Sequence, residues 1–155
     1  MKKPTGIILL AVFIVWGIVK TISTIFLRNN STDVIILNHY NLVWIGYISA
    51  IMLLTLGVAS LFSIFTKKKW GGVKTLYLLF LLNTIFTLFV MILGLLNFEI
   101  TKDAYVQSRI SRGLSTENID AIMNPATTIV LALAYVGFYS FLTFYVHKKR
   151  EYFSS

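Results

Sequence analysis

The chain has no cysteine, few charged residues and few prolines. Without cysteine it can form no disulfide and no thiolate-ligated metal site, and it has no thiol chemistry. Charged residues make up only 13% of the 155 residues, whereas a soluble domain carries about 25%. Only two prolines are present, so long helices can run without interruption. These shortages exclude a disulfide-stapled scaffold and disfavour a soluble domain.

Four long apolar runs dominate the remaining sequence. They cover about residues 5–27, 41–65, 75–97 and 125–146. At 1.5 Å per residue, each run is long enough to cross a hydrocarbon core of roughly 30 Å as an α-helix. The connections are too short for a second folded unit, so residues 1–155 are predicted to form one domain. The expected fold is all-α: an integral membrane, antiparallel four-helix transmembrane bundle.

The basic residues are distributed unevenly between the two sides of these runs. One side receives nine of them: Lys2, Lys3, Lys67, Lys68, Lys69, Lys74, Lys148, Lys149 and Arg150. The other side receives four: Arg28, Lys102, Arg109 and Arg112. This asymmetry is the positive-inside pattern and predicts that both termini are cytoplasmic. The first apolar run continues past Gly17 beyond the length of a signal-peptide core, so an uncleaved span is expected.

Groups that carry chemistry are scarce. His39 and His147 fall on opposite sides of the expected membrane and cannot share a metal within one chain. No run holds a pair of carboxylates, no nucleophile lies beside a base, and Gly71-Gly72 has the character of a turn. No platform of basic and aromatic residues lies outside the runs, which argues against nucleic acid as a partner. The sequence predicts a protein that is not an enzyme and has no metal, cofactor or catalytic residue.

The two outer connections, residues 28–40 and 98–124, differ in character. The first contains the apolar tetrad 34–37, which is expected either to lie in the membrane interface or to begin a longer, tilted second span. In the second, Ser115 and Thr116 are placed to cap a short amphipathic helix over residues 117–123. This helix would lie over the bundle mouth, where an outside partner makes first contact, or it is a solvated connector. Pro125 follows Asn124 as expected at the start of a helix.

Small and polar residues within the runs indicate how the helices pack. The small residues let helices approach closely, inside the bundle or against a second copy of the chain. Those proposed for packing are Gly46, Ala50, Gly57, Ser60, Gly137 and Ser140. Asn83 shares a helix face with Thr87, where interhelical hydrogen bonds are expected. Lys20 is the one clear charge in a span, and it either extends to the membrane surface or meets an acidic group of a partner or another span.

Two segments resemble a known family. The third run ends in Phe98-Glu99-Ile100-Thr101, and the fourth passes through Tyr135-Val136-Gly137-Phe138-Tyr139-Ser140. Together with the short chain and the lysine-rich hairpin, they are similar to the four-span immunity proteins of pore-forming colicins. The resemblance implies a protein of the bacterial inner membrane that binds a toxin's apolar helical hairpin within the bilayer and blocks its channel. The contact residues it implies are Lys20, Asn83, Glu99, Thr101 and Arg109.

Three other functions fit the same pattern. The chain can be an accessory subunit that packs against a larger membrane complex through its small-residue faces. It can also form a small channel or carrier by oligomerisation, although no ring of carboxylates is present to select cations. Phage exclusion is a further membrane-defence role. The sequence does not separate phage exclusion from immunity. A bundle without catalytic groups or an ion path favours a protein that works by binding another protein in the lipid bilayer.

Overall fold

The computed structural model describes residues 5–26, 31–66 and 72–153, and within these ranges the chain is helical with no strand. Four of its helices are long and apolar enough to cross a membrane. They are α1 (Thr5–Phe26), α3 (Val43–Thr66), α4 (Gly72–Leu96) and α7 (Pro125–Lys148). The prediction of an all-α chain with four uninterrupted apolar helices is therefore confirmed. The lysine-rich link at 67–71 lies outside the described residues.

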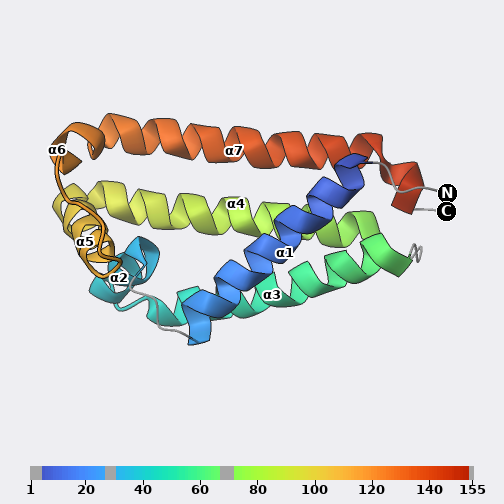
Figure 1. Ribbon diagram of the computed structural model, residues 1–155, viewed down its shortest axis with the longest axis horizontal. Helices are drawn as coiled ribbons and strands as arrows, with labels where there is room; N and C mark the ends of the chain where they lie inside the picture. The colour runs from blue at the N-terminus through green and yellow to red at the C-terminus, as the bar shows by residue number, and fades with distance from the viewer. Residues whose placement is uncertain (1–4, 27–30, 67–71, 154–155) are drawn as a thin grey trace.

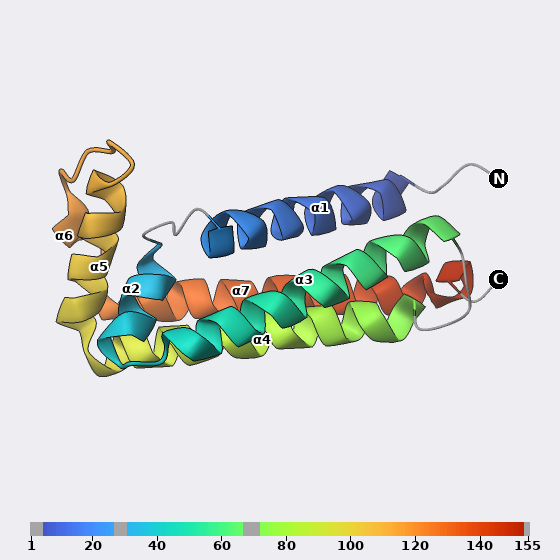
Figure 2. The ribbon, with the colours of Figure 1, turned by 90° about the horizontal axis from the view of Figure 1, so that it is seen from below.

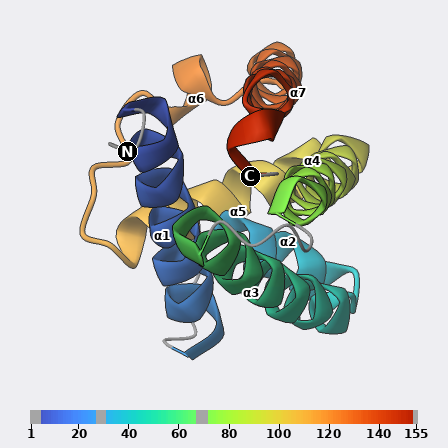
Figure 3. The same cartoon turned by 90° about the vertical axis from the view of Figure 1, so that its right-hand side faces the viewer.

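α4 and α7 run along the long axis of the molecule, α1 crosses it obliquely, and short helices lie at one end (Figures 1 and 2). The short helices are α2 (Thr32–His39), α5 (Phe98–Ile110) and α6 (Ile119–Ile122), which together are called the cap. The opposite end, called the basic end, holds the start of α1 and α4, the end of α3 and α7, and a 3-10 turn, η1 (Arg150–Phe153). Lys74, Lys148 and Lys149 are exposed there. Seen end-on, α1, α3, α4 and α7 form an arc in this order, each packed on the next (Figure 3).

The first outer connection is a separate helix rather than the start of the second span. α2 ends in a Schellman pattern, in which the Leu42 N–H donates to the Leu37 carbonyl (2.8 Å) and the Asn41 N–H to the Asn38 carbonyl (3.0 Å). Asn41 takes the left-handed conformation that this turn needs, with φ of 56°. The continuous, tilted second span is thus ruled out. The apolar tetrad is instead used for packing, since Ile36 and Leu37 are buried against Val90 and Ala104.

The second outer connection contains a helix that was not predicted. α5 follows α4 after a single break at Asn97 and runs for 13 residues. It ends in the same kind of turn as α2, with Gly113 at φ of 66° and the Leu114 N–H donating to the Arg109 carbonyl (3.0 Å). The helix expected over residues 117–123 is shorter and forms α6. Its apolar residues do not share one environment, since Ile119 is buried whereas Ile122 is 52% exposed.

Two side-chain hydrogen bonds fasten the cap to α4. The Thr101 hydroxyl donates to the Gly94 carbonyl (2.7 Å), and the Tyr40 hydroxyl donates to the Leu93 carbonyl (3.1 Å). Both carbonyls lie in the last turn of α4, where backbone acceptors lack helical partners. The cap is therefore held at a fixed angle to the long helices. At the start of α7 the Asn124 side chain accepts from the Thr127 N–H (2.8 Å), as predicted.

The small residues of α3 lie where two helices come close. A Cβ added at Gly57 would lie 2.9 Å from Ile18 of α1, and one added at Gly46 would lie 2.9 Å from Leu37 of α2. Ser60 is fully buried and Ala50 is half-buried. Gly57 thus allows α1 and α3 to approach, because a larger side chain would separate them.

Candidate functional site

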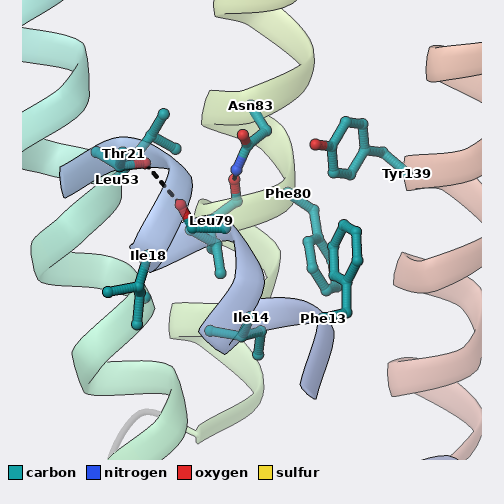
Figure 4. Close-up of a pocket in the computed structure, with 11 residues that line it drawn as sticks. Phe13, Ile14, Ile18, Thr21, Leu53, Leu79, Phe80, Asn83 and Tyr139 are labelled. Atoms are coloured by element: carbon teal, nitrogen blue, oxygen red, sulfur yellow. Dashed lines mark hydrogen bonds between the residues drawn. The ribbon is translucent and has the colours of Figure 1, made fainter. Parts of the chain in front are cut away.

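A small pocket lies at the edge of the hydrophobic cluster of the basic end, near the middle of α4. This cluster lies around Leu76 and Phe80, and a second cluster lies under the cap around Val90. The pocket has a volume of about 50 Å³, enough for a water molecule. All four long helices line it, and Figure 4 shows side chains from each. The lining residues include Phe13, Gly17, Thr21, Asn83 and Tyr139.

The pocket lies at the level where α1 diverges from α7 as it crosses the molecule. Near the basic end the two helices touch, since a Cβ at Gly6 would collide with the Tyr145 ring. Farther along, the Phe13 and Phe138 rings meet edge to face at 5.3 Å between centroids. Beyond that point α1 turns towards α3, where Ile18 packs on Gly57 (Figure 1). We call this pocket, which lies where α1 diverges from α7, the lateral opening.

Two polar groups in the lateral opening have unused hydrogen-bonding capacity. The Asn83 side-chain amide donates to the Leu79 carbonyl (2.9 Å), but within the described residues its side-chain oxygen accepts no hydrogen bond. The Tyr139 hydroxyl likewise makes none there, and it points towards Asn83 in Figure 4. The Thr21 hydroxyl, by contrast, donates to the Gly17 carbonyl (2.9 Å). Asn83 and Tyr139 thus offer an acceptor and a donor in apolar surroundings, where such groups are costly to leave unpaired.

α7 has the least protein around it of the four long helices. Only 6% of its most apolar stretch is buried, against 22–28% for the other three. Phe141 and Phe144 are 63% and 65% exposed. Together with the lateral opening beside it, α7 presents a long apolar surface that the chain itself does not cover. This arrangement is suited to binding an apolar helix that carries a hydrogen-bonding group.

The chemistry available elsewhere is limited. The described residues contain no group of three or more His, Asp or Glu side chains able to hold a metal ion. The Tyr77 hydroxyl and His147 Nδ1 lie 3.0 Å apart at the basic end, whereas His39 belongs to the cap. The two histidines are therefore at opposite ends of the molecule, as the sequence predicts.

The structure places the five expected contact residues in different settings. Asn83 lines the lateral opening. Glu99 is exposed in the first turn of α5, where a negative charge suits the helix dipole. Thr101 is buried and its hydroxyl fastens α5 to α4, so it has a structural role rather than a surface one. Arg109 donates to the Ser115 carbonyl (2.6 Å) and to the Tyr105 hydroxyl (3.2 Å), and so holds the turn after α5.

Lys20, the fifth contact residue, has an acidic neighbour in its own chain. Its side chain is exposed on the cap half of α1, and its charge acts on Asp33 of α2. Part of the Asp33 side chain reaches the surface, yet protein atoms crowd its carboxyl, and the lost hydration raises its pKa above 3.8. The positive charge of Lys20 opposes this effect and lowers the pKa. The sequence predicts an acidic neighbour in a partner or in another span, whereas Asp33 lies on the short helix α2 of the cap.

Two of the expected packing residues lie on the outer surface of α7. Gly137 and Ser140 are exposed, and nothing lies within 4 Å of a Cβ added at Gly137. They do not pack inside the bundle of one chain, because α4 contacts the opposite side of α7. Packing against a second copy or a partner stays a prediction for these residues.

Sequence reasoning missed the aromatic part of the lateral opening. Phe13 and Tyr139 line it, and Phe138 contacts the Phe13 ring. Phenylalanine and tyrosine are frequent in this chain and do not stand out. Comparison with protein-family models, curated proteins and solved structures found no match for this chain. The function is therefore proposed from the geometry of the site.

Proposed function

We propose that this protein acts by binding another membrane-inserted protein, and that it is an immunity protein that blocks a pore-forming bacteriocin. In this proposal the chain crosses the bacterial inner membrane four times as an antiparallel bundle with both ends cytoplasmic. The supporting observation is the lateral opening: Asn83 and Tyr139 offer unpaired hydrogen-bonding groups to the bilayer beside the uncovered surface of α7.

The proposed mechanism needs no bond to be made or broken. An apolar hairpin of the toxin lies along α7 and α1, and a polar group of the hairpin bonds to Asn83 or Tyr139. Each such bond in a membrane is worth roughly 1–2 kcal/mol at most, so it discriminates between hairpins more than it provides affinity. Close packing on the aromatic surface supplies the remainder. A hairpin held in this way cannot rearrange into a channel.

The topology can be tested by labelling single cysteines, since the native chain has none to interfere. Glu117→Cys in the cap and Glu151→Cys in η1 are a matched pair of exposed glutamates at opposite ends. In intact spheroplasts, a membrane-impermeant maleimide is expected to label the cap variant and to leave the η1 variant unlabelled until the membrane is opened. Labelling of the η1 variant alone in intact spheroplasts would invert the topology. Equal labelling of both variants would show that the chain does not separate two compartments.

The immunity function can be tested by co-expression with the pore-forming toxin encoded nearest to this protein. Cells that make both proteins are expected to survive, whereas cells with the toxin alone die. Asn83→Leu removes the amide and keeps a similar volume, and it is expected to reduce protection. Death as fast as in controls would end the immunity proposal. Co-purification of a large stoichiometric partner in mild detergent would then favour the accessory-subunit function, for which the uncovered α7 surface is equally suitable.

A further inference from the structure

The cap contains a second and larger concavity, which is separate from the lateral opening. It lies between α2 and α5 and has a volume of about 290 Å³. Its floor is apolar and comes from Ile35 of α2 with Ile100 and Ala104 of α5. Its rim is polar. We call it the cap pocket.

The polar rim consists of groups that the chain leaves unpaired. Asn38 and His39 come from the last turn of α2, and Asp103 and Gln107 lie one turn apart on α5. Within the described residues, the side chains of Asn38, Asp103 and Gln107 make no hydrogen bond or ion pair. Amide oxygens and one carboxylate thus converge over an apolar floor, which is the usual composition of a binding pocket.

The charge of the cap favours a cationic occupant. The outer connections, residues 28–42 and 97–124, contain five acidic residues and four basic ones, for a net charge of −1, although the whole chain has +8. Two of the basic residues make hydrogen bonds within the cap: Arg109 donates to the Ser115 carbonyl, and Arg112 to the Ser108 carbonyl (2.9 Å). Asp103 of the cap pocket therefore presents its carboxylate at the acidic end of a strongly polarised molecule.

We infer that the cap pocket binds a lysine or arginine side chain of a protein partner on the outer side of the membrane. The aliphatic stem would lie on Ile35 and Ile100, and the cationic head would meet the Asp103 carboxylate and the amide oxygens of Asn38 and Gln107. This inference rests on the proposed function for the outward placement of the cap. The partner would then be recognised in water at the cap pocket as well as in the bilayer at the apolar surface of α7.

The test uses small probes and does not need the partner. Purified full-length protein in lipid nanodiscs is titrated with Nα-acetyl-lysine methylamide, with the arginine analogue, and with the neutral Nα-acetyl-norleucine methylamide. The side-chain amide NMR signals of Asn38 and Gln107 report on the pocket. Both cationic probes are expected to shift these signals to saturation, and the norleucine probe to shift them far less. Equal shifts from lysine and norleucine probes, or no saturable shift, would overturn the inference.

Matched variants assign the binding to the pocket. Asp103→Asn is expected to weaken binding of the lysine probe roughly tenfold, because the acceptor keeps its shape but loses the negative charge that strengthens its hydrogen bond to the ammonium. Glu117→Gln removes an exposed charge of the same kind from the cap outside the pocket, and should leave binding unchanged. Gln107→Leu provides a second pocket variant if Asp103→Asn fails to fold, and should weaken binding a few fold. Unchanged binding in folded pocket variants would contradict the inference.

The outcomes separate this inference from the proposed function. Probe binding that persists while co-expressed cells die would leave the cap pocket standing and end the immunity proposal. Protection of co-expressing cells by a protein whose cap pocket binds no cationic probe would overturn this inference and leave the immunity proposal standing.

Discussion

Replacing Gly94 with leucine is expected to detach the cap from α4 and to lower the free energy of unfolding by about 2–4 kcal/mol. A Cβ at this position would lie 2.7 Å from the Thr101 hydroxyl oxygen and 3.6 Å from the Ile36 side chain. The Thr101 side chain would have to rotate away, which breaks its hydrogen bond to the Gly94 carbonyl. The substitution therefore destabilises the contact between α4 and α5 in two ways, by overpacking and by the loss of a buried hydrogen bond.

Gly137→Leu is the matched control, because it makes the same substitution in a long helix where nothing lies within 4 Å. Reversible unfolding in a mild detergent gives the stability of both variants. Hydrogen exchange measured by mass spectrometry shows whether the loss is confined to the cap, since α5 amides should then exchange faster than those of α3. Equal stability of the two variants would mean that the Gly94–Thr101 joint does not hold the cap.

Gly17→Leu is expected to abolish protection against the toxin while the protein stays folded. Gly17 lines the lateral opening, is exposed, and has nothing within 4 Å of an added Cβ. A leucine there points into free space, so it fills the site a partner would use without disturbing the contacts between α1 and α3. If a partner helix needs that space, binding should weaken roughly ten- to a hundredfold, the cost of overpacking a close interface.

The measurement is the survival of co-expressing cells, together with the unfolding of purified Gly17→Leu as a check on folding. Gly137→Leu is the comparison variant, because it adds the same side chain on the uncovered surface of α7, outside the lateral opening. Full protection by Gly17→Leu would show that the opening is not the contact site. Loss of protection by Gly137→Leu alone would move the contact to the outer surface of α7.

The long helices could be predicted from the sequence, but most of the cap could not. Apolar runs of more than 20 residues define α1, α3, α4 and α7 by length alone, and Asn124 with Pro125 marks where α7 begins. α5 lacks such a signal. The residues it buries are Thr101, Ala104 and Ser108, which are small and weakly apolar, so its buried face does not stand out in the sequence. Contacts with α2 and α4, rather than its own composition, determine its position.

The same distinction applies to the lateral opening. Asn83 could be found from the sequence because an amide stands out within an apolar run. Tyr139 and Phe13 could not, since their importance depends on the angle at which α1 crosses α7. That angle is determined by close contacts at Gly6 and Gly57, which lie on different helices. No pattern within one helix reveals a crossing angle between two.

The way α1 diverges from α7 has a consequence for how a partner would exchange with lipid. Within a bilayer the space beside Tyr139 is occupied by acyl chains, so a helix that enters must displace them. Because hydrocarbon chains are as apolar as the helix, exchange releases little hydrophobic free energy, and van der Waals fit decides the outcome. Acyl-chain length and unsaturation would then act as competitive ligands. The membrane's fatty-acid composition, as well as the toxin's sequence, would determine how tightly the protein holds its partner.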